Sequence, residues 1–229
     1  MNNSLIFSII TTCMIVLSTG QCHAEPQKEH EKWWTENTPK MFDTFDGWLG
    51  DTNSTSRVLA REHIKKMDYK TILDVPCGTC TEYLGYKQEE MPIAYTGLDI
   101  TAYLVNRAKK MGINAVEGSI EKIPFKDSSF EIVYSRHILE HLDYYELALN
   151  EAIRVAKNEV LVVFFINPST TAPDSISRAP YNGAILYHNR YNRDKLNAFV
   201  TKNPKVKSTK WEDIGGIAND ESFLHIYLK

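Results

Sequence analysis

The chain has 229 residues, enough for one large domain with a substantial core, and 43% of them are hydrophobic. Its formal net charge of -3 offers no basic surface for a phosphate backbone, so no nucleic-acid partner is expected. Four cysteines are too few for a disulfide scaffold, and the ordinary composition excludes a wholly disordered chain or one with many membrane spans.

Residues 1–24 differ from the rest of the chain. The run from Leu5 to Thr19 carries no charge, and Ala24 stands where a signal-peptidase site needs a small residue. We interpret this segment as a signal peptide or membrane anchor, with membrane association through residues 5–20. The protein is then exported or anchored; if the segment is instead a buried N-terminal helix, the protein is cytoplasmic.

Residues 25–69 form a second region, polar but rich in aromatic side chains. Trp33 and Trp34 are followed by three more aromatic residues before position 49, a density that favours docking on the main domain over a free linker. Residues 57–67 show a loose helical period after three residues, 54–56, that suit a helix start.

From Lys70 onward, strand-like and helix-like segments alternate, which predicts a single domain over residues 70–229. Runs that are apolar on both faces indicate a parallel sheet covered on both sides by helices. The expected strands are 71–75, 93–100, 113–116, 130–134 and 160–166, and the expected helices are 102–111, 137–156 and 192–199. Two further strands, 206–214 and 223–228, joined through Gly215 and Gly216, would close the sheet as an antiparallel pair.

Polar residues follow the predicted strands at the edge where such sheets bind ligands. Asp74 ends the first strand, before a tight turn through Gly78 that opens a helix. Asp99 ends the second strand about 20 residues beyond that turn, where a carboxylate can accept hydrogen bonds from ribose hydroxyls.

These segments resemble the class I S-adenosylmethionine-dependent methyltransferases, of the methyltransferase type 11 kind. The resemblance is carried by LDVPCGT (73–79), TGLDI (96–100) and above all EGSIEKIPFKDSSFEIVYSRHILEHL (117–142), and it covers residues 70–166 well. It implies an α/β fold with a doubly wound, mostly parallel seven-stranded sheet, helices on both faces, and S-adenosylmethionine as cofactor. The implied activity is methyl transfer to an unidentified small-molecule acceptor.

The resemblance also implies residue roles. Asp74 and the turn around Gly78 would hold the methionyl end of the cofactor, Asp99 the ribose, and Ile100, Ser119 and Ile120 the adenine. The segment from Ser135 to His137 would line the methyl-donor side. The full set of implied cofactor-binding residues is Asp74, Pro76, Gly78, Asp99, Ile100, Ser119, Ile120, Ser135 and Arg136. Pro76 and Cys80 stand where the family's turn usually has glycines.

Two histidines are candidates for a general base, which is needed only if the acceptor must lose a proton. His137 lies near the expected methyl side, and His188 lies in the segment 167–191, where this family commonly builds substrate contacts. His137 and His141 are spaced as metal ligands can be, but no third ligand is apparent, so the sequence predicts no metal site.

Two other functions stay open at this point. Cys77 and Cys80 form a C-x-x-C motif after a strand, the arrangement of thiol-disulfide redox proteins, in which a helix N-terminus lowers the thiol pKa. A non-catalytic protein that binds the cofactor would carry the same cofactor residues as an enzyme.

Overall fold

The computed structural model of the protein describes residues 28–214 and 221–229. Residues 1–27 and the Gly215-Gly216 junction therefore lie outside the described residues. Among the residues described, no helix is both long and apolar enough to cross a membrane.

The core of the fold is a seven-stranded sheet in the order β3-β2-β1-β4-β5-β9-β8. The first five strands are parallel: β1 (Thr71–Asp74), β2 (Ala94–Asp99), β3 (Ala115–Glu117), β4 (Phe130–Arg136) and β5 (Ala156–Phe164). β9 (Glu221–Leu228) runs antiparallel to β5, and β8 (Val206–Ile214) runs antiparallel to β9. From β1 the chain first adds strands β2 and β3 on one side and then β4 and β5 on the other, so the switch point of this doubly wound sheet lies beside β1. This confirms the predicted fold class.

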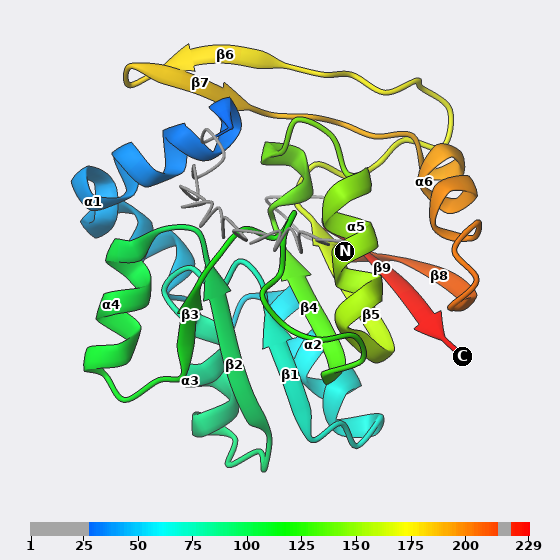
Figure 1. The fold of residues 1–229 in the computed structure, drawn as a ribbon, viewed down its shortest axis with the longest axis horizontal. Helices are drawn as coiled ribbons and strands as arrows, with labels where there is room; N and C mark the ends of the chain where they lie inside the picture. The colour runs from blue at the N-terminus through cyan, green and yellow to red at the C-terminus, as the bar shows by residue number, and fades with distance from the viewer. Residues whose placement is uncertain (1–27, 215–220) are drawn as a thin grey trace, which may run out of the picture.

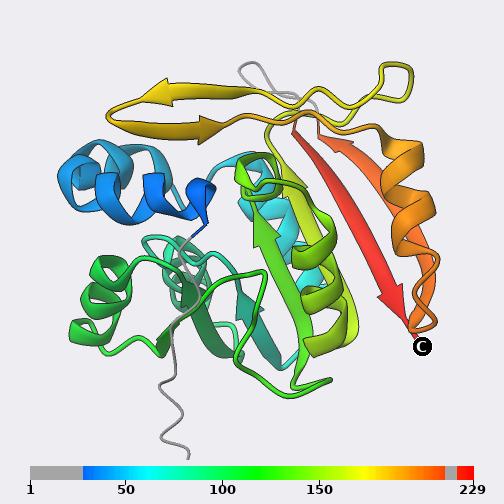
Figure 2. The same cartoon turned by 45° about the horizontal axis from the view of Figure 1, so that its top comes forward.

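Helices cover both faces of the sheet, as Figures 1 and 2 show. One face packs against α2 (Thr55–Lys66), α3 (Thr81–Gln88) and α4 (Ala102–Lys110), whose apolar side chains share a buried cluster with those of the strands. The other face packs against α5 (Glu146–Val155) and α6 (Arg193–Val200). Asn192 caps α6, since its side chain accepts a hydrogen bond from the Lys195 amide.

The aromatic N-terminal region forms helix α1 (Glu29–Leu49), which docks beside the carboxyl ends of the strands. Trp33 is buried, and its indole Nε1 donates a 2.7 Å hydrogen bond to the Tyr181 carbonyl. Tyr181 belongs to a hairpin of β6 (Arg178–Tyr181) and β7 (Ala184–Tyr187), which lies alongside α1 in Figures 1 and 2. Trp33 therefore confirms the expected docking of this region.

The predicted long helix over His137–Ala156 was wrong. His137 has a φ of 56°, and the chain makes only a 3-10 turn at Leu139–His141 before α5 begins at Glu146. Glu140 holds this irregular segment in place, because its buried carboxylate accepts hydrogen bonds from the Phe165 and Ile166 amides, at 2.7 and 3.2 Å. Leu139 and Leu142 of this segment are buried in the core although the segment is not an α-helix.

Candidate active site

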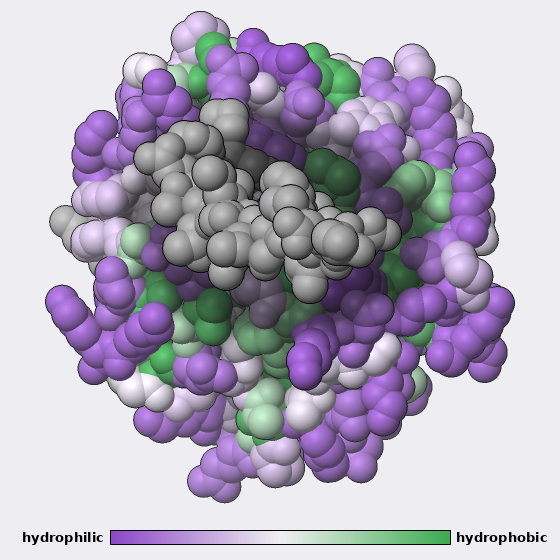
Figure 3. Space-filling view, in the orientation of Figure 1, coloured by the Kyte–Doolittle hydropathy of each residue, from purple (hydrophilic) through white to green (hydrophobic). Residues whose placement is uncertain are grey.

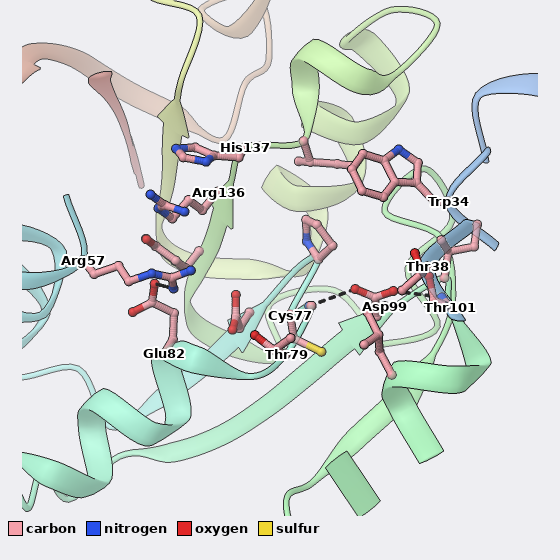
Figure 4. Close-up of a pocket in the computed structure, with 17 residues that line it drawn as sticks. Trp34, Thr38, Arg57, Cys77, Thr79, Glu82, Asp99, Thr101, Arg136 and His137 are labelled. Carbon is pink, nitrogen blue, oxygen red and sulfur yellow. Dashed lines mark hydrogen bonds and ion pairs between the residues drawn. The ribbon is translucent and has the colours of Figure 1, made fainter. Parts of the chain in front are cut away.

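A cavity lies at the carboxyl ends of β1, β2 and β4, with about 860 Å³ of empty space, open solvent at its mouth included. Figure 4 shows its lining, with Arg57 and Glu82 on one side and Asp99 and Thr101 on the other. Most of the surface seen in Figure 3 is hydrophilic, and hydrophobic residues show as small scattered patches. The cavity is lined by Trp34, Thr38, Arg57, Asp74, Pro76, Cys77, Gly78, Thr79, Glu82, Asp99, Ile100, Thr101, Leu104, Tyr134, Arg136, His137 and Ile138.

Asp99 is held in place by backbone amides. Its Oδ2 accepts a 2.9 Å hydrogen bond from the Gly78 amide, and its Oδ1 accepts a 2.8 Å bond from the Thr101 amide. Burial raises the pKa of Asp99, while these hydrogen bonds lower it and so limit the rise. The carboxylate keeps lone pairs that these amides do not use, so it can still accept hydrogen bonds from a ligand.

The turn before α3 brings Gly78 to Asp99. The Cys77 amide donates to the Leu98 carbonyl at 2.9 Å, and the Cys80 amide donates to the Cys77 carbonyl at 2.7 Å. Gly78 has a φ of 52° and Cys80 a φ of 58°, a backbone conformation that favours glycine. The turn thus needs glycine-like geometry at Cys80, although its buried side chain does not line the cavity.

Buried charges form the floor of the cavity. Asp74 accepts a 2.7 Å hydrogen bond from the Tyr95 hydroxyl, and burial together with the nearby Glu82 carboxylate raises the pKa of Asp74 well above its usual value. Glu82 forms an ion pair with Arg57, and both side chains are buried. Within the described residues, Glu82 Oε2 and the Tyr134 hydroxyl have no hydrogen-bond partner. They are the kind of group that a polar ligand would satisfy.

A second ion-pair group lies at the end of β4. The Glu221 carboxylate lies 2.9 Å from Arg136 Nη2 and 2.6 Å from His137 Nε2. The pKa of His137 is lowered to about 4, because the effect of burial exceeds that of the hydrogen bond with Glu221, which raises the pKa. Burial raises the pKa of Glu221, but hydrogen bonds with His137 and Ser56 and the charge of Arg136 outweigh it and bring the pKa to about 2. At neutral pH a neutral imidazole therefore donates Nε2–H to an ionised carboxylate.

A smaller cavity, with about 360 Å³ of empty space including open solvent, adjoins the first and shares Asp99 and Ile100 with it. Ser119 and Ile120 form one wall, and His30, Glu31 and Trp34 of α1 form another. The Ser119 hydroxyl donates a 2.7 Å hydrogen bond to Glu31, so α1 is fastened to the loop after β3.

The structure brings together most of the residues that the sequence singled out, in these two cavities. The larger holds Asp74, Pro76, Gly78, Asp99, Ile100, Arg136 and His137, and the smaller adds Ser119 and Ile120. Ser135 and His188 line neither cavity. Ser135 is buried within β4, whereas His188 is exposed just after β7, with its ring centroid 5.1 Å from that of His141. His188 is not placed with His137 because residues 167–191 extend into the hairpin beside α1.

The residues of the larger cavity and its supports that sequence reasoning missed include five polar or aromatic ones from the helices and β9. They are Trp34 and Thr38 of α1, Arg57 of α2, Glu82 of α3, and Glu221 at the start of β9. The dense aromatic residues before position 49 were a signal for Trp34. The other four carry no local pattern, since each reaches the site through tertiary packing.

Comparison with known proteins identifies a methyltransferase domain. A family model described as a methyltransferase domain matches residues 73–164. An uncharacterized protein of Methanocaldococcus jannaschii is 27% identical over 161 residues, which cover 69% of this chain and 67% of that protein. An uncharacterized methyltransferase of Schizosaccharomyces pombe is 31% identical over 130 residues, covering 49% of this chain and 46% of that protein. The chain thus spans about two thirds of the first relative and under half of the second.

The fold agrees with this result. The Burkholderia thailandensis 1,6-didemethyltoxoflavin-N1-methyltransferase, solved with its acceptor and S-adenosylhomocysteine, has a TM-score of 0.64 at 12% identity, with 90% of this chain and 92% of that chain covered. Residues 73–164 are therefore a methyltransferase domain, and the chain has the fold of solved S-adenosylmethionine-dependent methyltransferases. Methyl transfer is the reaction of a methyltransferase domain, and the Burkholderia protein holds S-adenosylhomocysteine, the product left when S-adenosylmethionine gives up its methyl group. A thiol-disulfide redox function through Cys77 and Cys80 finds no support, and both thiols are buried.

The charged and polar groups that line the cavity match those of S-adenosylmethionine. S-adenosylmethionine carries two positive charges, one carboxylate, a ribose diol and an adenine ring. The cavity offers the carboxylates of Asp74, Glu82 and Asp99 together with the guanidinium of Arg57. The oxygens Thr38 Oγ1, Glu82 Oε2 and Tyr134 OH are buried and lack partners among the described residues, which fits a polar ligand in contact with them.

Proposed function

We propose that this protein transfers the methyl group of S-adenosylmethionine to a small molecule bound beside His137. The observation that carries the proposal is the Asp99 carboxylate, fixed by two backbone amides at one side of a cavity that has His137 in its wall. The cofactor supplies a methyl group on a sulfonium, which is already a good leaving group. The protein must therefore chiefly hold acceptor and methyl group in line.

The cofactor-binding roles follow from position in the two cavities. Asp99 accepts the ribose hydroxyls, and Ile100, Ser119 and Ile120 border the adenine in the smaller cavity. Asp74, Pro76 and Gly78 bind the methionyl end, helped by the Arg57–Glu82 pair at the floor. A charged pair of this kind can match both the ammonium and the carboxylate of an amino acid.

His137 is the proposed general base. Its Nε2–H is donated to Glu221, which leaves Nδ1 as the atom that can accept a proton from the acceptor. Glu221 then orients the ring and stabilises the imidazolium that forms, as a carboxylate does for a catalytic histidine. Ser135 and His188 take no part in this proposal because they line neither cavity.

Walls contributed by α1 limit the acceptor to a small molecule. Trp34 and Thr38 face the cavity from α1, and α1 is fastened at both the β6–β7 hairpin and the Ser119 loop. A macromolecular acceptor would have to displace these contacts to reach the site. The proposed acceptor is therefore a molecule that fits within the cavity itself.

The direct test is production of S-adenosylhomocysteine with a panel of small alcohols, phenols, amines and carboxylic acids. An acceptor that needs deprotonation should be methylated at least 100-fold more slowly by His137→Asn, since general base catalysis contributes about 10²- to 10⁴-fold. His188→Ala is the matched control and should retain the wild-type rate. Cofactor binding with no turnover on any acceptor would favour the non-catalytic alternative.

Residues 1–24 act, in this proposal, as an export signal or membrane anchor, as the uncharged run from Leu5 to Thr19 suggests. A chain that begins at Glu25 should then fold and bind the cofactor as the full chain does. Cell fractionation should find the full chain with the membranes or shortened at its N-terminus. Full-length protein recovered untrimmed from the soluble fraction would contradict this part of the proposal.

A further inference from the structure

A second group of ionisable side chains lies away from the cavity, where α2 packs on the sheet. It consists of His63 in α2, Glu159 in β5 and His225 in β9. Glu159 is fully buried, and His225 is only 2% exposed. None of the three lines the cavities of the candidate active site.

The three side chains converge on the Glu159 carboxylate. His63 Nε2 lies 3.0 Å from Glu159 Oε1 and 2.9 Å from Oε2, and His225 Nδ1 lies 2.7 Å from Oε1. One ligating atom from each of the three lies within 4.8 Å of the others. Around a tetrahedral zinc ion, with bonds of about 2.0–2.1 Å, ligand atoms are about 3.3 Å apart. Outward shifts of a few tenths of an ångström would therefore admit such an ion.

A buried nitrogen of His225 gives a second, independent indication. Its Nε2 is buried and has no hydrogen-bond partner among the described residues, although Glu212 Oε2 is 4.0 Å away. A histidine that ligates a metal through one ring nitrogen typically donates the N–H of the other to a carboxylate. Ligation through Nδ1 would place the proton on Nε2, facing Glu212 as its acceptor.

Glu159, like His225, has a neighbouring side chain that would orient it as a metal ligand. The Tyr69 hydroxyl donates a 2.9 Å hydrogen bond to Glu159 Oε2, which orients a carboxylate that would ligate through its remaining lone pairs. The His63 side chain keeps 18% of its surface exposed, so an ion or a water molecule can reach the group from that side.

We propose that His63 Nε2, the Glu159 carboxylate and His225 Nδ1 bind one divalent transition-metal ion of the zinc type. Two imidazoles and a carboxylate are a donor set that zinc accepts, and water would complete the tetrahedron on the exposed side of His63. The ion would join α2 to β5 and β9. Because α2 also carries Arg57 at its opposite end, the site would fix the helix that supplies this residue to the active-site cavity.

The test is a calorimetric titration of the full chain, purified without a histidine tag, with Zn²⁺. We expect one ion per chain, and His63→Ala should weaken binding at least 100-fold. Glu212→Gln should weaken it about 10- to 100-fold, the usual effect of losing a partner of a ligating histidine. His30→Ala is the matched control, because His30 belongs to a separate group with Glu31 and Glu121, and it should bind as the wild type does.

Two further measurements keep the outcome unambiguous. Co²⁺ in place of Zn²⁺ should give the visible absorption of a tetrahedral ion without the sulfur charge-transfer band that Cys77 and Cys80 would produce. Far-ultraviolet circular dichroism shows whether His63→Ala is folded; if it is not, His63→Gln replaces it. The proposal is overturned by a wild-type chain that binds no Zn²⁺, by a folded His63 variant of unchanged affinity, or by loss of binding in His30→Ala. In the first case the group is a hydrogen-bonded triad only.

Discussion

The two sides of the active-site cavity are positioned by different kinds of group. On one side, which we call the backbone-held side, Asp99 is fixed by the amides of Gly78 and Thr101. On the other, the ion-pair side, side chains position one another: Arg57 with Glu82, and Glu221 with Arg136 and His137. One side is built from two turns, and the other from α2, α3, β4 and β9.

This difference has an energetic consequence. A carboxylate held by backbone amides stays in place as long as the turns are intact. Its loss removes contacts to a ligand and leaves two amides without their acceptor, but it leaves no uncompensated charge. A buried ion pair that loses one member leaves an uncompensated charge in a low-dielectric interior. We therefore expect changes on the ion-pair side to affect stability, and changes on the backbone-held side to affect cofactor binding.

The largest effect, a loss of stability, is expected for Arg57→Ala. It leaves the buried Glu82 carboxylate without its ion-pair partner, and removal of one member of a buried pair costs about 3–5 kcal/mol. The free energy of unfolding in urea measures this loss. Lys32→Ala is the control: it breaks the exposed Lys32–Glu36 pair, at 3.7 Å, and should change stability by under about 0.5 kcal/mol. Equal effects of the two variants would remove the distinction between the sides.

Asp99→Ala should lower stability less than Arg57→Ala does, because the Gly78 and Thr101 amides lose an acceptor but no buried charge is left unpaired, and it should weaken S-adenosylhomocysteine binding. Losing the hydrogen bonds of an ionised carboxylate costs about 1.5–3 kcal/mol, or roughly 10- to 100-fold in affinity measured by calorimetry. Asp127→Ala, at a side chain that is 75% exposed, is the control and should bind normally. Unchanged affinity in the Asp99 variant would contradict its assignment to the ribose.

His137 should make stability depend on pH. Its pKa in the folded protein is about 4 against 6.5 for an unperturbed histidine, so the unfolded chain takes up the proton first as the pH falls. Stability is therefore lost between pH 6.5 and 4, by about 2 kcal/mol at pH 5. Asn suits the positive φ of His137, so His137→Asn is the appropriate comparison. The free energy of unfolding in urea of the wild type, relative to that of this variant, should fall by about 2 kcal/mol from pH 7.5 to pH 5. A difference that does not change with pH would contradict the prediction.

The smallest effect on cofactor affinity is expected for Cys80→Gly, on the backbone-held side. Glycine relieves a left-handed backbone that costs about 1–2 kcal/mol for other residues, while loss of the buried thiol offsets part of that gain. Affinity for S-adenosylhomocysteine should stay within about threefold of the wild type or improve, as calorimetry would show. A tenfold loss would mean that the Cys80 side chain itself supports the cofactor turn.

The same contrast explains what the sequence could predict. Asp74 and Asp99 stand at fixed places after apolar strands, so local pattern was enough to bring them to one edge of the sheet. Glu221 lies 84 residues from His137, and no local signal connects them. The prediction of a helix over 137–156 was wrong for a similar reason. The loop there is held by hydrogen bonds from the Phe165 and Ile166 amides to Glu140, and these residues are distant from Glu140 in the sequence. The hairpin at 178–187 escaped prediction because its stabilising contacts are with α1, as at Trp33.

A crystal structure of the protein with S-adenosylhomocysteine tests the central claim most directly. The account predicts the ribose hydroxyls within hydrogen-bond distance of both Asp99 oxygens, with the Gly78 and Thr101 amides still bound to them. The adenine should lie beside Ile100, Ser119 and Ile120, and the sulfur should face the His137 side of the cavity. A ligand bound elsewhere, or one whose ribose makes no contact with Asp99, would contradict it.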